Sequence, residues 1–297
     1  MGPQSRTDGR PGAIWAVPAI AFFGLFALVP MAVVVYLSFT EWSGIGTPVW
    51  SGLTNWSKLT TDAQLGQSIR LTVSLTVISW LVQTAICLPL GVWLAGHGRT
   101  RGVLAAVFFV PLLMSSAAIA ILWAGLLDPN FGLASVVGPL VGVKDGNFIG
   151  DPDLAFWVIV AVVAWQFIPF HVLLYQGSTR QIPIPLYEAA RIDGAGRVRQ
   201  FVSITLPQLR HTIITSSVLM LVGSLTYFDI VLILTGGGPG TSTRLLPLHM
   251  YLEGFRAFDM GYASVLAVLL LALGTTLSLI VSRVTGFSKM DSQKEGL

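Results

Sequence analysis

The 297-residue chain holds few side chains in arrangements that could carry chemistry. The glycine-rich run at 236–240 could cradle a phosphate, but no Gly-Lys-Ser/Thr follows it or occurs elsewhere in the sequence. His171 has no acidic or second histidine neighbour at ligand spacing, so we expect no metal site. Neither a Ser-His-Asp set nor a carboxylate pair is visible in the apolar segments. The sequence therefore predicts no catalytic residue, and the run at 236–240 is interpreted as a helix-breaking turn.

Asp229 is the one acidic residue well inside an apolar segment. Ionisable groups within a membrane usually face a cavity or a partner, because exposure to lipid is costly. Thr226 lies three residues earlier, on the same face of a predicted helix. Two interpretations stay open and equally supported: these residues contact a transported solute, or Asp229 ties its helix to a neighbouring helix or turn.

Other polar side chains in apolar segments are weaker candidates for contacts with a solute. Gln166 stands beside Trp165, and this pair could contact a sugar or equally bond a neighbouring helix. A polar stripe along one segment consists of Thr72, Thr76, Ser79 and Gln83. Such stripes more often join helices than bind solutes. The single cysteine, Cys87, excludes an intramolecular disulfide and a cysteine-cluster metal site.

A polar, arginine-rich stretch at 188–207 separates two long apolar segments. Pro185 suits the first turn of a short helix over 186–193, since a first-turn residue needs no amide donor. Gly194 can adopt the left-handed conformation that ends such a helix. A second short helix over 197–204 would then lead to Pro207. The pattern predicts helix, turn, helix, and thus a docking surface rather than a spacer.

The composition places these residues in a bilayer. Hydrophobic residues make up 54% of the chain and charged residues 10%, far from the balance of a soluble domain. The net charge of +3 comes mostly from arginines near segment ends, so a nucleic-acid partner is disfavoured. We expect an all-α membrane protein with six transmembrane helices, each about 20 residues or longer. The predicted spans are 14–39, 71–95, 103–127, 154–177, 213–235 and 262–284.

The predicted organisation has a core and two tails. Residues 1–13 form an N-terminal tail, and the run at 14–39 is too long for a signal-peptide core, so it is interpreted as a retained span. Residues 40–70 form an external loop, 71–284 a core with five spans and a cytoplasmic loop at 178–209, and 285–297 a tail. Twelve of the seventeen Lys and Arg residues lie on the segments inside the cell if both termini are cytoplasmic. The excess of positive charge favours that orientation.

The polar loop resembles a known signature. Glu188-Ala189-Ala190, three residues, Gly194, nine residues, Ile204, one residue and Leu206-Pro207 match every fixed position of the EAA loop. That loop belongs to permease subunits of binding-protein-dependent ABC importers. The full spaced pattern on a loop of a multi-span protein is a specific signal, whereas a lone Glu-Ala-Ala would carry none. The predicted coupling residues are Glu188, Ala189, Ala190, Arg191, Asp193, Gly194, Ile204, Leu206 and Pro207.

Further stretches are similar to the carbohydrate-type (type I) branch. They are 182–187 before the Glu-Ala-Ala, Phe228-Asp229 with 234–239, and 258–264 before the last span. The chain looks like the MalF and glycerol-phosphate permease A side of the permease pair. MalF itself carries extra spans and a large external insert, whose contacts cannot be transferred to this chain.

The resemblance implies a type I importer permease fold and a set of partners. A second permease, a cytoplasmic ATPase dimer, an external solute-binding protein and a sugar, oligosaccharide or polyol would accompany the chain in a bacterial-type inner membrane. ATP and Mg would be bound by the ATPase, with no cofactor in this chain. Glu188 would contact a basic ATPase residue, Ala189 and Ala190 would allow close approach, and Ile204, Leu206 and Pro207 would fix the loop to the next span. The alternative is a self-sufficient secondary transporter, for which Asp229 would be the only coupling acid.

Overall fold

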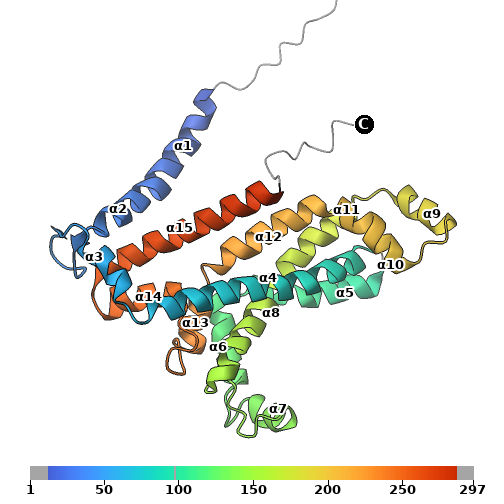
Figure 1. The fold of residues 1–297 in the computed structure, drawn as a ribbon. Helices are drawn as coiled ribbons and strands as arrows, with labels where there is room; N and C mark the ends of the chain where they lie inside the picture. The colour runs from blue at the N-terminus through green and yellow to red at the C-terminus, as the bar shows by residue number, and fades with distance from the viewer. Residues whose placement is uncertain (1–12, 97, 286–297) are drawn as a thin grey trace, which may run out of the picture. The chain divides into compact units, whose positions relative to one another are not determined.

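The computed structural model describes residues 13–96 and 98–285, and their regular secondary structure is almost all helical (Figure 1). The strands found within these ranges are β1 (Thr40–Glu41) and β2 (Val49–Trp50), which pair antiparallel. The chain divides into two compact units. One unit comprises residues 1–61 and 250–269, and the other comprises residues 62–249 and 270–297.

The first unit begins with an apolar helix. A 3-10 turn (Ala13–Ala16) leads into α1 (Val17–Phe23), a π-helical segment (Gly24–Leu28) and α2 (Val29–Leu37). Pro30 occupies the first turn of α2, where its missing amide is accommodated by the π segment just before it. The stretch Val17–Leu37 is long and apolar enough to cross a membrane, as the first predicted span requires.

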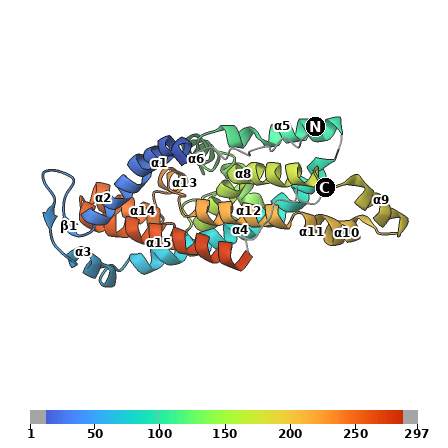
Figure 2. The same cartoon turned by 90° about the horizontal axis from the view of Figure 1, so that it is seen from above.

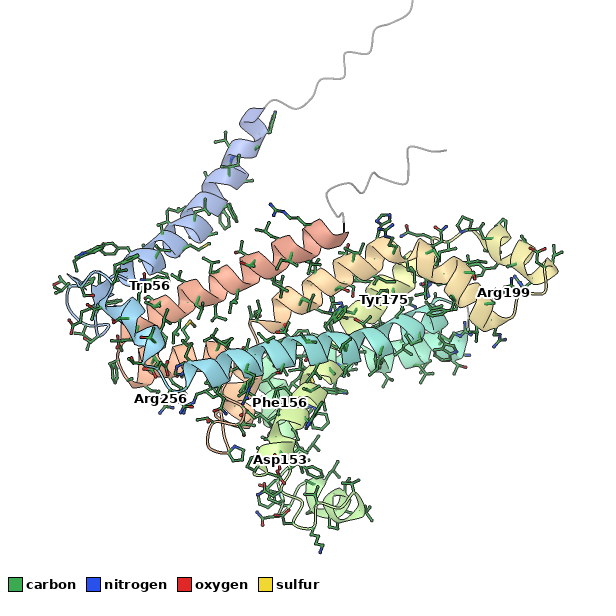
Figure 3. The ribbon with its side chains drawn as sticks, in the orientation of Figure 1. Trp56, Asp153, Phe156, Tyr175, Arg199 and Arg256 are labelled. Atoms are coloured by element: carbon green, nitrogen blue, oxygen red, sulfur yellow. The ribbon has the colours of Figure 1, made fainter. Side chains whose placement is uncertain are left out.

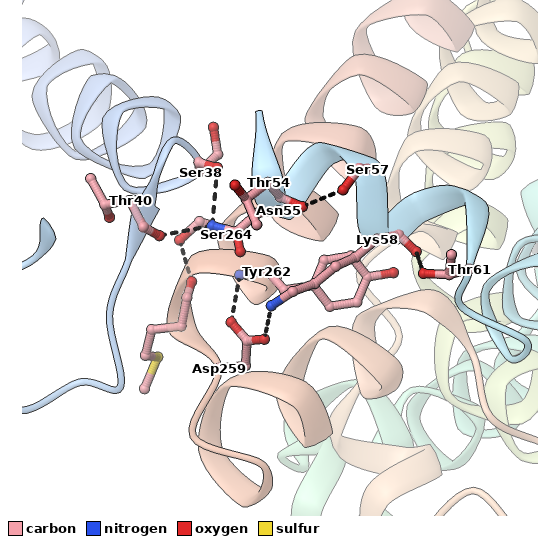
Figure 4. Close-up of polar contacts among 11 residues, drawn as sticks. Ser38, Thr40, Thr54, Asn55, Ser57, Lys58, Thr61, Asp259, Tyr262 and Ser264 are labelled. Atoms are coloured by element: carbon pink, nitrogen blue, oxygen red, sulfur yellow. Dashed lines mark hydrogen bonds and ion pairs between the residues drawn. The ribbon is translucent and has the colours of Figure 1, made fainter. Parts of the chain in front are cut away.

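Polar contacts hold the loop that follows against the start of a later helix in the same unit (Figure 4). The loop contains α3 (Thr54–Ser57) and a 3-10 turn (Lys58–Thr60). The buried Asn55 amide donates to the Thr40 carbonyl at 2.7 Å, and Lys58 pairs with Asp259. Asp259 also accepts from the backbone amide of Tyr262, in the first turn of α15 (Met260–Thr285). These contacts fix where α15 begins.

The second unit is built on two long helices, α4 (Leu65–Ala95) and α8 (Pro152–Thr179), which pack along each other. The close approach requires Gly91, because a Cβ there would lie 2.6 Å from the Cβ of Tyr175. Tyr175 is fully buried at this contact (Figure 3). Pro169 lies inside α8, as expected from the sequence.

Capping carboxylates set where these helices start. Asp62 accepts from the amides of Gln64 and Leu65, so α4 begins at Leu65, six residues before the predicted start. Asp151 accepts from the amides of Asp153 and Leu154 and starts α8 at Pro152. Helix α4 therefore extends into the stretch predicted as the end of the external loop.

The third predicted span is not one helix. In place of a continuous segment at 103–127 the chain forms α5 (Arg99–Phe108), a 3-10 turn (Val110–Leu113) and α6 (Ser116–Leu126). Pro111 cannot donate to a helical ladder, and the Ser115 hydroxyl accepts from the amide of Ala118, which starts a new helix. Pro111 and Ser115 therefore break the helix, although the stretch is apolar enough to be predicted as one span.

The fifth predicted span, 213–235, is also broken. It consists of α12 (Arg210–Ser224) and α13 (Asp229–Leu234), with a non-helical link at 225–228. The Thr226 hydroxyl donates to the Gly223 carbonyl at 2.7 Å, a local bond that competes with the helical ladder. This break positions a candidate site described below.

Four helices of the described residues are long and apolar enough to span a membrane: Val17–Leu37, Leu65–Ala95, Pro152–Thr179 and Met260–Val281. The apolar α6 is shorter. The remaining helical elements between the spans include α7 (Ala134–Leu140), α14 (Leu246–Tyr251) and a π segment (Leu252–Arg256). The fold is that of an all-helical membrane protein, and the count of six spans and the cytoplasmic placement of the termini stay predictions.

Candidate functional sites: a coupling loop and a cavity

The polar loop folds as helix, turn, helix. It contains α9 (Ile184–Ile192), α10 (Arg197–Gln200), a π segment (Phe201–Thr205) and α11 (Leu206–Gln208), which leads into α12. Figures 1 and 2 both show α9 and α10 side by side beyond the end of α8. The predicted organisation of this loop is confirmed, with Pro185 in the first turn of α9 and Pro207 in the first turn of α11.

Gly194 makes the turn between the two helices. Its φ of +74° is left-handed, and the Ala195 amide donates back to the Ala190 carbonyl at 2.8 Å. The Gly194 amide donates to the Arg191 carbonyl at 3.1 Å. These two bonds form the Schellman arrangement, which satisfies carbonyls at a helix end. The predicted role of Gly194 as the left-handed helix terminator is confirmed.

A few inward contacts attach the loop to the helices behind it. The hydroxyls of Tyr187 and Thr205 lie 2.9 Å apart, which ties α9 to the π segment. Thr205 is buried, and Ile204 packs against the core that contains Tyr175 and Leu209. Ile204 is thus placed as a contact between the loop and the spans, in line with its expected role.

The outward face combines charge with exposed apolar side chains. Glu188, Ala189 and Ile192 lie on one face of α9 by helical spacing, and all three are exposed. Ile192 is 86% exposed, and Val198 on α10 is 78% exposed. Arg199 extends from the same end of the unit (Figure 3). Large apolar side chains left bare beside charges are typical of a protein interface.

The other predicted coupling residues complete this description. Arg191 and Asp193 are exposed, and the Arg191 guanidinium donates to the Tyr187 carbonyl at 3.3 Å. Ala190 and Leu206 are half-buried, and Pro207 is exposed. Sequence reasoning missed the bare Ile192 and Val198, although their position beside the charged residues of a polar loop was a usable signal.

A second candidate site is a cavity of about 490 Å³ between α6, α8, α12 and α13. Four aromatic rings line it: Phe167 stacks on Tyr227 with ring centroids 5.2 Å apart, and Phe170 and Phe228 also line it. Polar groups are few and include Thr226, Asp229 and His171. The Nδ1 atom of His171 lies 2.9 Å from the Ser216 hydroxyl. An apolar cavity with a few placed polar groups is the usual form of a small-molecule site.

The structure brings two of the four predicted pathway residues together. Asp229 and Thr226 both line the cavity, but not on one helical face as predicted. Thr226 lies in the break between α12 and α13, and Asp229 is the exposed first residue of α13. The prediction that Asp229 lies well inside a continuous helix is therefore wrong. The reason is the local hydroxyl bond of Thr226, which opens the helix before Asp229.

The two glutamines lie outside the lining. Gln166 donates to the Ser116 hydroxyl at 2.9 Å, so it joins α8 to α6 behind the cavity wall. Gln83 is buried on α4, and it belongs to the polar stripe rather than to the wall. The stripe joins helices and loops as expected: Thr76 accepts from Ser224 on α12, and Thr72 accepts from the Leu246 amide.

The aromatic wall was not recognised from the sequence. Phe167 and Phe170 are three residues apart and share a face of α8, so a stripe of rings was visible. Tyr227 and Phe228 come from the non-helical link, which the hydropathy pattern hid. Their convergence depends on the break before α13.

Neither a metal centre nor a phosphate loop emerges from the described residues. They contain no group of three or more His, Cys, Asp or Glu side chains that could hold a metal ion. Residues 235–237 form a turn after α13, and the Gly236 amide donates to the Val231 carbonyl at 2.9 Å. The interpretation of this run as a helix-breaking turn is confirmed.

Comparison with known families decides the class. Residues 87–285 match the model of the binding-protein-dependent transport system inner membrane component. The chain belongs to this permease family. A probable ABC transporter permease of Bacillus subtilis, YurN, is 34% identical over 90% of this chain and 93% of its own. The trehalose/maltose transport system permease MalF of Thermococcus litoralis is 30% identical over 95% of this permease and 96% of its own length.

Solved structures confirm the fold of the permease. A crystal structure of a bacterial alginate ABC transporter, in complex with a periplasmic protein carrying an alginate pentasaccharide, contains a chain that matches 92% of this one. The TM-score is 0.80, and 20% of the residues are identical. The likeness establishes a type I importer permease fold for this chain. The sequence resemblance to that family is confirmed, and the secondary-transporter alternative gains no support.

Proposed function

We propose that this permease forms part of the membrane pathway by which an ABC importer takes up a sugar, oligosaccharide or related polyol. The observation that carries the proposal is its full-length similarity to relatives named for such solutes. They include the trehalose/maltose permease MalF and the diacetylchitobiose permease NgcF of Streptomyces coelicolor, which is 28% identical over 95% of this chain. The permease itself is a transport subunit rather than an enzyme.

The cavity fits this class of solute. Aromatic rings such as Phe167 and Tyr227 offer flat faces for the C–H surface of a sugar ring. Asp229 and Thr226 at the same cavity supply partners for hydroxyl groups. We therefore propose Asp229 and Thr226 as pathway residues, with Gln166 supporting the wall through Ser116. Gln83 does not line the cavity, so it stays a weaker candidate for the pathway.

The loop from α9 to α11 would couple transport to ATP hydrolysis. Its bare apolar residues and Glu188 would enter a cleft of a cytoplasmic ATPase, with Glu188 against a basic residue there. ATP and Mg would be held by that separate ATPase. Closure of the ATPase dimer would move the docked loops, and rigid-body rocking of the spans would open the pathway alternately to each side. The inward contacts Tyr187–Thr205 and Ile204 would transmit the movement.

The proposed assembly follows from this coupling. The permease would pair with a second permease and receive solute from an external binding protein. The description of its family, an inner membrane component of a binding-protein-dependent transport system, supports the binding protein. Six spans with both termini in the cytoplasm would place the loop at the ATPase, in a bacterial-type inner membrane. The distribution of basic residues supports this orientation.

The test is a detergent purification of the tagged chain from its native membranes. We expect a second permease and an ATPase to co-purify. The ATPase activity should be stimulated by a solute-binding protein together with one sugar. Recovery of this chain alone, able to move solute into liposomes without ATP, would overturn the proposal in favour of a secondary transporter.

A further inference from the structure

Helix α7 (Ala134–Leu140) faces outward with its large apolar side chains. A stripe at spacing i, i+3, i+4, i+7 and i+8 consists of Leu133, Val136, Val137, Leu140 and Val141. These side chains are between 45% and 80% exposed, with Val137 the least exposed and Leu140 the most. This stripe has the spacing that a helix normally turns toward a core. Here it is left bare, so something outside this unit covers it.

The helix cannot rotate to bury the stripe, because its small face is already seated. Ala134 is 2% exposed. A Cβ at Gly138 would lie 2.5 Å from the Cα of Gly146 and 2.8 Å from the Val143 carbonyl oxygen. Only glycine fits that contact. The loop at 141–146 therefore packs on the small face of α7 and fixes the apolar stripe outward.

The start of α7 is held at the end of an apolar helix. A Cβ at Gly132 would lie 2.5 Å and 2.6 Å from the carbonyl oxygens of Gly125 and Leu126, the last turn of α6. The Asp128 carboxylate accepts from the amides of Asn130 and Phe131 and shapes the turn between them. The stripe begins one residue after this contact, so it starts where α6 ends.

The end of α8 near α7 carries residues typical of a membrane boundary. Trp157 lies near the start of α8 and is 54% exposed, a typical position for an aromatic side chain at a membrane boundary. Figure 3 shows Asp153 and Phe156 at the end of α8 that lies near α7. The bare stripe therefore lies near the end of a span that carries both an exposed tryptophan and charged residues.

We propose that α7 is an interfacial helix whose stripe inserts between lipid headgroups and acyl chains. Helices of this kind bury an apolar face about 5–10 Å into that boundary. The loop carries Asp128, Asp145 and Asp151 against a single Lys144, so attraction to anionic lipid does not drive the insertion. The contact is apolar, and it should be insensitive to salt.

This contact would give α6 a fixed depth. With 11 residues, α6 is roughly 16 Å long, about half of a hydrocarbon core. Ser116 at its other end lines the cavity, and α6 also packs on α13, which carries Asp229. Insertion of α7 into the lipid would therefore hold α6, and the cavity wall that it forms, at a fixed depth in the membrane.

The experiment places a fluorescent thiol label on the stripe. Val136→Cys and Leu140→Cys are labelled in the full chain, purified with the subunits that accompany it and reconstituted in phosphatidylcholine nanodiscs without binding protein. Lys144→Cys is the matched control, because Lys144 is exposed on the same loop outside the stripe. The unaltered chain gives the background, since Cys87 is fully buried.

Lipids that carry a nitroxide at the headgroup end of the acyl chain should quench both stripe labels several-fold more than the control, equally at low and high salt. The two stripe positions keep the test usable if one variant fails to fold. Equal quenching at all three positions would overturn the proposal. It would also be overturned if the lipid nitroxide left the stripe labels unquenched and their emission changed only when the external binding protein was added, since α7 would then be a protein-docking face.

Discussion

The coupling loop and the cavity show two different ways in which the chain builds a site. The loop is formed by a short run of sequence, and its fold depends on contacts between neighbours such as Gly194 and Ala190. The cavity collects residues from four helices that are far apart in the chain, and it exists because α12 stops before Asp229. A site made from one run can be recognised by spacing alone. A site made by convergence requires the packing.

Substitutions in the coupling loop and in the cavity should impair different steps of transport. We expect the largest loss of uptake from a substitution in the loop. Glu188→Lys places a like charge against the proposed basic ATPase residue. We expect it to abolish ATP-driven uptake while membrane insertion stays intact, because Glu188 is exposed. Uptake into cells and chain abundance in membranes are the measurements.

Glu188→Gln is the matched control, since it removes the charge and keeps the shape. An exposed ion pair contributes only about 0.2–1 kcal/mol, so this variant should keep a large part of the uptake. Normal uptake in Glu188→Lys would contradict the docking role.

The turn of the loop offers the next test. Gly194→Ala puts a Cβ on a residue with a φ of +74°, which costs about 1–2 kcal/mol. We expect a weaker apparent affinity for the ATPase, measured by titrating ATPase into the reconstituted permease. Gly196→Ala is the control two residues away, because the φ of Gly196 is −68° and a Cβ there meets nothing within 4 Å.

If both glycine variants behave alike, the left-handed turn does not set the docking geometry. The interface would then depend on the exposed side chains of α9 and α10 alone.

Substitutions at the cavity should change the affinity for the sugar and leave the coupling to the ATPase intact. Asp229→Asn keeps the size of the side chain and removes its charge, so we expect the sugar concentration for half-maximal uptake to rise up to about tenfold, the equivalent of ~1.4 kcal/mol. Basal ATPase activity should not change, because Asp229 lines the cavity and is not part of the coupling loop. Asp229→Ala should have the larger effect.

Unchanged uptake and affinity in both Asp229 variants would remove this residue from the pathway. Phe167→Ala then tests the aromatic wall itself, since Phe167 stacks on Tyr227 without any charge.

The same contrast explains what the sequence could predict. The helix, turn, helix of the loop followed from Pro185 and Gly194, whose preferences act over a few residues. The long apolar helices followed from composition. The broken spans did not, because hydropathy averages over the stretch and hides Ser115 and Thr226, whose hydroxyls end or start a helix locally. The cavity depends on the second of these breaks, so its aromatic wall could not be located from the pattern.

The smallest expected effect concerns the polar stripe of α4, which lies between the two regions in role. Ser224 on α12 donates to Thr76 at 2.8 Å, and both side chains are buried. We expect a double-mutant cycle with Thr76→Val and Ser224→Ala to give a coupling energy of about 0.6 kcal/mol, typical of hydrogen bonds between membrane helices.

The cycle is measured by unfolding in mixed micelles, with uptake recorded in parallel. Thr275→Val is the control, because its hydroxyl donates within its own helix to the Leu271 carbonyl and joins no second element. A strictly additive cycle would mean that the stripe does not hold the helices together. If Thr76→Val instead changes the sugar affinity and leaves the stability unaltered, the stripe lies on the solute pathway. Residues of α4 would then serve both helix packing and solute transport.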